Sequence, residues 1–220
     1  MGEHYLTSTL RSKLIVYLRR VLRLVYSIRL IFLPDLRILL RKFATSESAA
    51  IDTGDALALY GHVIKRKPKA ILELGPGTST AVIALAISKS KLSSRFIAIE
   101  EDSSWMTYHR KTIGELALST VELIHRDIAP KELGGVTAAY YLDIPRVPYE
   151  FVHVDGPSNP KVGAAVSCDI IDLLPDLSPK CVIVFDGREA SARFALPYLE
   201  RAGFRTRRNP FTLSYEFVRG

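Results

Sequence analysis

Cysteine is scarce in this chain of 220 residues, which contains only Cys168 and Cys181. Two thiols are too few for the disulfide framework of a small secreted protein, so that class of protein is excluded. Cys181 begins an apolar run and is expected to be a buried thiol. We therefore expect a reducing, cytoplasmic environment and one main domain that folds around an apolar core.

Long uncharged apolar runs are also missing near the N-terminus. Basic residues interrupt the apolar stretches there after a few positions, far short of the ~18 residues that a membrane span requires. No small-residue cleavage site follows these stretches. The sequence therefore predicts neither a membrane-spanning helix nor a secretory signal peptide.

Acidic residues are scarce in the first 43 positions, where Glu3 and Asp35 accompany nine Lys and Arg residues. Residues 44–220 contain 21 basic and 21 acidic residues, so the whole net charge of +7 arises from the N-terminal segment. A nucleic-acid-binding function spread over the body of the protein is therefore excluded.

The N-terminal segment is predicted to form two helices. From Ser12 to Ile28, Lys and Arg fall on one side of a helical projection, and Leu, Ile and Val fall on the other. After Pro34, a second short helix has Leu36, Leu39, Leu40 and Phe43 on one face. Residues 1–45 are thus expected to form a basic amphipathic helical extension, and residues 46–220 the main domain.

Two interpretations of this extension stay open. Its apolar side packs on the domain or on a second copy of the chain, as in a homo-oligomer, or residues 10–43 lie on an anionic membrane surface. On a membrane, each basic residue contributes about 1 kcal/mol in addition to the burial of apolar side chains. The large aliphatic side favours a membrane over nucleic acid as the partner.

Beyond the extension, strands and helices alternate. Helices are expected at 53–66, 78–89, 102–118, 164–174 and 190–202, and strands at 70–74, 95–100, 121–125, 151–154, 181–185, 204–208 and 213–218. The alternation predicts an α/β fold with a Rossmann-like, doubly wound sheet whose first five strands are parallel. A short turn joins the last two strands, so the last strand is expected to be antiparallel. Residues 129–148 are expected to be less regular.

The stretch Ala70–Thr80 combines an apolar strand, a glycine turn and the start of a helix. Gly75 and Gly77 allow backbone conformations and close approaches that a Cβ would prevent. Ser79 is one of three hydroxyl residues able to cap the helix. In a doubly wound sheet, such a turn holds a nucleotide-like ligand beyond the carboxyl ends of the strands.

Acidic residues gather at these strand ends. They are Glu73, Glu100, Asp155 and Asp186 at four of the strands, and Asp127 two positions after a fifth. At one or two strand ends, Asp or Glu would be an ordinary turn residue. Five of them in corresponding places predict a binding site lined with carboxylates.

Over residues 50–220 this pattern resembles the class I S-adenosylmethionine-dependent methyltransferases. The resemblance implies S-adenosylmethionine as the cofactor, with Glu73, Gly75, Gly77 and Ser79 at its methionine part, Glu100 at the two ribose hydroxyls, Asp127 at the adenine and Asp155 near the methyl group. A narrower similarity to small O-methyltransferases rests on residues 73–80 and on Asp155-Gly156-Pro157.

A dinucleotide site is the main alternative within this fold. Its fingerprint requires a third glycine, which Thr80 replaces here. It also requires a pyrophosphate, which the carboxylate of Glu73 would repel. Both observations favour a cationic sulfonium ligand.

Asp155 and His153, two positions apart on one strand, are the catalytic candidates. An oxygen acceptor needs a base that removes its proton or a metal that lowers its pKa. Asp155 is the first choice as base and His153 the second. In metal-dependent relatives, aspartates at the positions of Asp155 and Asp186 bind a divalent ion together with an asparagine, and Gly187 replaces that asparagine here. A divalent metal therefore stays an open question.

The expected function is S-adenosylmethionine-dependent methylation of an oxygen on a glycan, a lipid-linked or a small-molecule acceptor near a membrane. The expected location is the cytoplasm, with peripheral attachment to the membrane as the finer expectation. The alternative function is that of a non-catalytic, membrane-associated or scaffold protein on a methyltransferase fold. Such a protein would bind liposomes through residues 10–43 and would not bind the cofactor.

Overall fold

The computed structural model describes residues 21, 24–44, 51–115, 120–208 and 214–219. Its helices are α2 Pro34–Ala44, α3 Thr53–Arg66, α4 Thr78–Lys89, α5 Ser103–Glu115, α6 Asp169–Leu173 and α7 Glu189–Arg201. Its strands are β1 Ala70–Leu74, β2 Arg95–Glu100, β3 Val121–His125, β4 Ile128–Leu133, β5 Val136–Tyr141, β6 Tyr149–Val154, β7 Val166–Ser167, β8 Leu177–Phe185, β9 Phe204–Arg208 and β10 Tyr215–Arg219. The alternation predicted for residues 53–125 is confirmed element by element.

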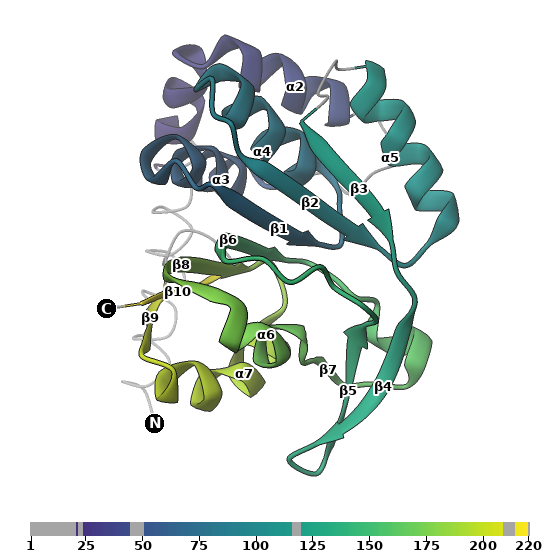
Figure 1. Cartoon of the computed structure of the whole chain (residues 1–220). Coiled ribbons are helices and arrows are strands. Elements are labelled where there is room, and N and C mark those ends of the chain that lie inside the picture. Colours follow the sequence, from purple (N-terminus) through teal and green to yellow (C-terminus); the bar gives the residue numbers. More distant parts are fainter. Residues whose placement is uncertain (1–20, 22–23, 45–50, 116–119, 209–213, 220) are drawn as a thin grey trace, which may run out of the picture.

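Seven strands form the main sheet, in the order β3-β2-β1-β6-β8-β10-β9 (Figure 1). The first five are parallel, and β10 is antiparallel to both β8 and β9. The Rossmann-like, mostly parallel sheet with an antiparallel end is therefore confirmed. Strand β1 lies between β2 and β6, so the strand order reverses at its carboxyl end, where such sheets bind their ligands.

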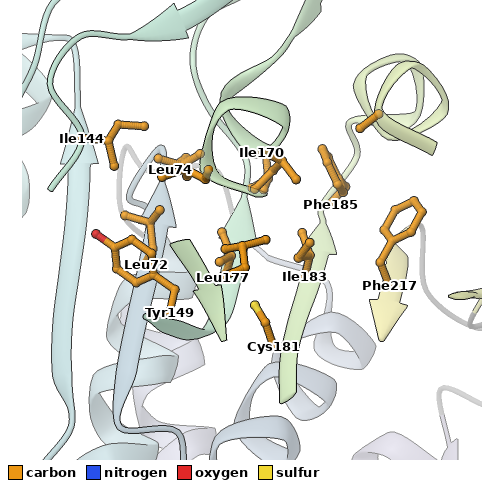
Figure 2. Packing of buried hydrophobic residues seen from close by; sticks show 14 of the residues in the cluster. Leu72, Leu74, Ile144, Tyr149, Ile170, Leu177, Cys181, Ile183, Phe185 and Phe217 are labelled. Atoms are coloured by element: carbon orange, nitrogen blue, oxygen red, sulfur yellow. The ribbon is translucent and has the colours of Figure 1, made fainter. Parts of the chain in front are cut away.

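Side chains of the sheet alternate between two apolar cores. Ile71 and Phe151 pack against α2, α3 and α4 on one face. On the other face Leu72, Leu74 and Ile183 pack toward α6 and α7 (Figure 2). Because successive strand residues point to opposite faces, Glu73 and His153 share the face of Ile71 and Phe151, beneath α3 and α4. The buried free thiol expected at Cys181 belongs to the other core.

Residues 128–141 form a hairpin, so the expectation of a less regular stretch at 129–148 is wrong for most of it. Strands β4 and β5 pair antiparallel and project from the main sheet (Figure 1). Gly134 and Gly135 connect them with φ of +60° and +76°. Two short runs separated by Gly-Gly are the sequence signature of a two-residue hairpin turn. The signal was therefore present in the sequence.

The helix expected at 164–174 is reduced to α6. Its first residues instead form β7, where Val166 and Ser167 pair with Ala138 and Ala139 of β5. The hairpin offers a free edge to the chain at this point, and strand pairing replaces the helix. The expectation is thus correct only for the second half of the range.

The N-terminal segment packs on the domain through α2. Leu36, Leu39 and Phe43 are at most 4% exposed, and they belong to the core formed by α3 and α4. Residues 24–31 are helical, whereas residues 12–20 and 22–23 of the predicted first helix lie outside the described residues. Within the described part of the chain, no helix is long and apolar enough to cross a membrane.

Candidate functional site

A cavity of about 590 Å³ lies beyond the carboxyl ends of β1, β2, β6 and β8. Its wall combines the glycine turn after β1, the start of α3, the first turns of α5 and the segments that follow β6 and β8. The parallel sheet brings these ends together at one edge, as the sequence predicted for its carboxylates. Seven acidic residues line the cavity, namely Asp52, Asp55, Glu100, Glu101, Asp102, Asp155 and Asp186, together with only two cationic ones, Lys161 and Arg188.

The two glycines of the turn after β1 serve different purposes. Gly75 has φ of +81°, and a Cβ there would lie 2.6 Å from the backbone nitrogen of Gly156. At Gly77, a Cβ would meet only the Oγ atom of Ser79, at 3.8 Å. Gly75 is thus required by the fold itself, whereas the missing side chain at Gly77 leaves open the hollow in which a ligand can lie.

Two adjacent glutamates stand at the carboxyl end of β2. Glu100 is 7% exposed, and its Oε1 atom accepts a hydrogen bond from the backbone nitrogen of Asp102 at 2.8 Å. Burial raises the pKa of Glu100 to about 7, and the neighbouring charge of Glu101 adds to this effect. Glu101 accepts hydrogen bonds from the Tyr141 hydroxyl at 2.7 Å and from the backbone nitrogen of Ser158 at 3.0 Å. It thereby joins the hairpin to the segment after β6.

Aromatic rings of α5 form another part of the wall. Asp102 precedes the helix and caps it, because its Oδ1 atom accepts a hydrogen bond from the backbone nitrogen of Ser104 at 2.9 Å. The rings of Trp105 and His109 are stacked with centroids 5.9 Å apart. Burial lowers the pKa of His109, which also bonds to the backbone of Pro76. A neutral imidazole therefore holds the glycine turn beside a flat aromatic surface.

Asp155 stands on the cavity wall with its side chain half exposed. Its Oδ1 atom lies 3.4 Å from Nε of Arg188, and that guanidinium also donates to the carbonyl of Pro157 at 2.8 Å. Partial burial raises the pKa of Asp155, while the positive charges of His153 and Arg188 oppose the rise. Asp155 is therefore a carboxylate that already has a cationic partner.

His153 and Glu73 lie beneath the cavity and do not line it. Both side chains are completely buried, with Nδ1 of His153 3.3 Å from Oε1 of Glu73. On the other side of the ring, Nε2 is 3.8 Å from Oδ2 of Asp186. Burial alone would lower the pKa of His153, but the two carboxylates raise it to about 10. The imidazolium is therefore a buried countercharge, and at neutral pH it has no free nitrogen to accept a proton.

The structure thus divides the predicted site residues into two groups. Gly75, Gly77, Ser79, Glu100, Asp155 and Asp186 line the cavity. Glu73 and His153 lie beneath it, and Asp127 is exposed outside it. Asp186 faces His153 and Asp155 faces Arg188. Among the described residues, no group of three or more His, Cys, Asp and Glu side chains is arranged to hold a metal ion.

The residues of the cavity wall that sequence reasoning missed include Asp55, Glu101, His109 and Lys161. Glu101 was marked only by its position next to Glu100. Asp55 stands in the first turn of α3, more than ten residues before the first strand, and no motif surrounds it. Only the packing of α3 across the sheet brings it to the cavity.

Comparison with known proteins agrees with this architecture. Residues 72–187, more than half of the chain, match the family model described as a methyltransferase domain. None of the curated proteins matches the chain.

Solved structures share the fold at low sequence identity. The SAH-bound methyltransferase PaMTH1 from Podospora anserina is 15% identical, with a TM-score of 0.57 over 84% of this chain and 86% of that chain. A putative caffeoyl-CoA O-methyltransferase from Staphylococcus aureus is 12% identical, with a TM-score of 0.58 over 87% and 98%. The O-methyltransferase TomG from Streptomyces achromogenes, in complex with SAM, is 18% identical, with a TM-score of 0.53 over 86% and 89%.

Proposed function

The chain belongs to the family of methyltransferase domains, and on that premise we propose that it is an S-adenosylmethionine-dependent O-methyltransferase. The observation that carries the proposal is the meeting of the glycine turn with Glu100 in one cavity at the end of β1. Two of the structural neighbours, TomG and the putative caffeoyl-CoA O-methyltransferase, are described as O-methyltransferases, and this supports oxygen as the methylated atom.

The residues of the cavity fit this cofactor. The hollow at Gly77 and the adjacent start of α4 would hold the methionine part. Glu100 would accept hydrogen bonds from the ribose hydroxyls. Only its Oε1 atom is bonded to the backbone of Asp102, so the Oε2 atom is available for this contact. Trp105 would offer its flat ring to the adenine. When bound, the cofactor supplies a methyl group on a positively charged sulfur.

The charge of the cavity favours this ligand over a dinucleotide. Seven acidic side chains with two cationic ones attract a ligand with a net positive charge and repel a pyrophosphate. The two cationic residues are also engaged: Lys161 lies 3.1 Å from Asp102, and Arg188 bonds to Asp155 and Pro157. The described cavity therefore offers a phosphate group little positive charge.

We further propose that the acceptor reaches the protein at an anionic membrane surface. The N-terminal apolar face consists of Leu24, Val25, Ile28, Ile31, Phe32 and Ile38, all between 41% and 78% exposed. The exposed residues Arg29 and Arg41 lie in the same segment. Apolar side chains can insert into a bilayer, and anionic headgroups attract the arginines beside them. This combination is typical of segments that bind an anionic membrane surface.

The position of this face favours a membrane-borne acceptor. Its helical segment, residues 24–31, contacts α3 through Tyr26, whose ring occupies the space next to Gly54. Asp52 and Asp55, on either side of Gly54, line the cavity. The N-terminal apolar face is thus attached to the part of the wall that an acceptor would pass. A glycan, a lipid-linked molecule or a small hydroxylated compound is the proposed acceptor.

Calorimetric titration with S-adenosylmethionine tests the cofactor assignment. Glu100→Gln keeps the bond to Asp102 but loses the charge, so we expect affinity to fall roughly 10- to 100-fold, the loss of one or two charge-assisted hydrogen bonds. Glu122→Gln, a change of the same kind on the exposed surface of β3, is the control and should leave the affinity unchanged. Wild-type affinity should also weaken below pH 7 as Glu100 takes up a proton.

Two results would overturn the assignment. An unchanged affinity in Glu100→Gln would remove Glu100 from the cofactor site. A wild-type protein that binds anionic vesicles but shows no heat of binding with S-adenosylmethionine would establish the alternative, a non-catalytic protein on this fold.

A further inference from the structure

Next to the cavity lies a group of ionisable side chains, most of them buried, that the proposed cofactor site does not use. It contains Glu73, His153 and Asp186 in a row, with Asp55 at the end of the row toward the cavity. Asp55 is 7% exposed. It lines both the main cavity and a small cavity below, whose wall also includes His153 and Asp186. Asp55 therefore connects the open site with the buried charges.

Unlike Asp186 and Asp155, Asp55 has no cationic side chain in ion-pair contact with it among the described residues. Asp186 faces the His153 imidazolium, and Asp155 faces Arg188. The Oδ1 atom of Asp55 is buried and makes no hydrogen bond within the described chain. An unpartnered carboxylate oxygen inside a protein is costly, and such a cost is typical of functional positions.

The charges that face Asp55 come from several elements. Asp52 precedes it at the start of α3, Asp186 follows β8, and His153 belongs to β6. The wall of the small cavity also includes His62 of α3 and Glu216 of β10, with Nε2 of His62 3.7 Å from Oε2 of Glu216. Ser214 forms a side-chain hydrogen bond with Asp55. Burial, followed by the charges of Asp186 and Asp52, raises the pKa of Asp55 to about 7, although His153 opposes the rise.

We propose that Asp55 is the general base of the methyl transfer and accepts the hydroxyl proton of the acceptor. This inference rests on the proposed function. In the step, the acceptor oxygen forms a bond to the methyl carbon, and the electron pair of the carbon–sulfur bond stays on sulfur. The proton of the acceptor hydroxyl moves to a carboxylate oxygen of Asp55 and is released to water through the cavity. Atoms and charge balance with no further reactant.

Asp55 suits this task better than the two candidates from the sequence. A general base works best when its pKa is close to the working pH. His153 already carries its proton at neutral pH, and Asp155 is held by Arg188. His153 acts in this arrangement as a buried positive charge, with its Nε2 atom 3.8 Å from Oδ2 of Asp186.

The first test compares two acceptors in Asp55→Asn. Phenol keeps its proton at about pH 8, whereas 4-nitrophenol is ionised because its nitro group stabilises the phenolate. We expect transfer from S-adenosylmethionine to phenol to fall at least ~100-fold, the usual contribution of a general base, and transfer to 4-nitrophenol to change less than about 3-fold. Asp35→Asn removes another first-turn aspartate, at the exposed start of α2, and should change neither rate. Equal loss on both acceptors, or no loss on phenol, would overturn the proposal.

The second test needs no acceptor. An aspartate whose pKa is higher in the folded than in the unfolded chain stabilises the fold below the unfolded pKa and loses that contribution as pH rises through the folded value. Asparagine does not ionise, so Asp55→Asn should melt at a higher temperature than the wild type, by a margin that is small near pH 5 and widens toward pH 8.5. A lower melting temperature at both pH values would establish a purely structural Asp55 and overturn the proposal.

Cofactor titration separates this proposal from the proposed function. Asp55→Asn should bind S-adenosylmethionine within about 3-fold of the wild type, since the proposed cofactor contacts lie at Gly77, Glu100 and Trp105. Normal cofactor binding together with unchanged phenol methylation would reject Asp55 as the base and keep the enzyme. Absence of cofactor binding in the wild type would reject the proposed function itself.

Discussion

The cavity and the N-terminal apolar face depart from the ordinary distribution of side chains in opposite ways. In the cavity, carboxylates such as Glu100 and Asp55 are more than nine-tenths buried. At the N-terminal apolar face, Phe32 and Leu24 are 78% and 63% exposed. Each arrangement costs stability, because buried charges lose water and exposed apolar side chains contribute nothing to the core. Regions that give up stability in this way are where binding functions are expected.

The two regions also have opposite charge. Residues 1–43 hold the whole net charge of +7, whereas the cavity wall is dominated by acidic residues. The net charge of the whole chain therefore does not describe the charge of the cavity. The proposed ligand of the cavity is small and cationic, and the proposed partner of the N-terminal apolar face is an anionic surface. The following predictions separate the contributions of the two regions.

The largest effect is expected beneath the cavity, in His153→Gln. The variant leaves Glu73 buried without its countercharge, and breaking a buried ion pair costs about 3–5 kcal/mol of unfolding free energy. His153 has a pKa of about 10 in the folded protein, above the ~6.5 of an unperturbed histidine. Its contribution is therefore fully present below about pH 6.5 and is lost as pH rises toward 10.

Denaturant unfolding at several pH values measures this effect. The stability gap between the wild type and His153→Gln should be widest near pH 6 and narrow toward pH 10. His125→Gln, at an exposed histidine that ends β3, should stay within about 0.5 kcal/mol of the wild type. A gap that does not change with pH would mean that His153 is neutral in the fold.

A medium effect is expected in the glycine turn, where two glycines distinguish folding from binding. Gly75→Ala should destabilise the protein by about 1–3 kcal/mol, because its φ of +81° and its contact with Gly156 leave no room for a Cβ. Gly77→Ala should leave stability within about 0.5 kcal/mol yet weaken S-adenosylmethionine binding, because the new methyl group enters the hollow. Thermal unfolding and calorimetry of both variants measure the two quantities. Loss of stability in Gly77→Ala would contradict this division.

Much of the fold could be predicted because its signals are local. The strand, turn and helix at 70–89 were predicted at their observed bounds, since glycines and a switch of apolar period mark them. The hairpin was missed although Gly134-Gly135 marked it. The partial failure at 164–174 is different in kind, because β7 exists only where β5 offers an edge to Val166.

The site was less predictable than the fold for the same reason. Glu100 ends β2 and Asp155 directly follows β6, so the topology alone brings them to the cavity. Glu73 is the last residue but one of β1, and its side chain points to the face beneath α3. A prediction that considers only the ends of strands does not distinguish the two faces of the sheet. Asp55 reaches the cavity through the packing of α3 on the sheet, which no local pattern encodes.

The smallest effect is expected at the N-terminal apolar face, and it concerns binding alone. Phe32→Ser should lower partition into phosphatidylglycerol vesicles about 10-fold, because a ring at the membrane surface contributes about 1.5 kcal/mol, the lower end of the range for a buried aromatic side chain. Arg29→Gln should lower it about 5-fold, the loss of about 1 kcal/mol of attraction to anionic lipid. Neither variant should change the melting temperature, since both side chains are exposed.

Point variants test this face better than deletion of residues 1–43. The deletion would also remove Leu36, Leu39 and Phe43 from the core, so aggregation of the shortened protein would say nothing about lipid. Vesicle flotation of the full chain, with phosphatidylcholine vesicles as the uncharged control, measures partition directly. Equal binding to both lipids would contradict the role of the arginines. A wild-type dimer that Phe32→Ser converts to a monomer, with no vesicle binding in either, would make the face a contact between two copies of the chain.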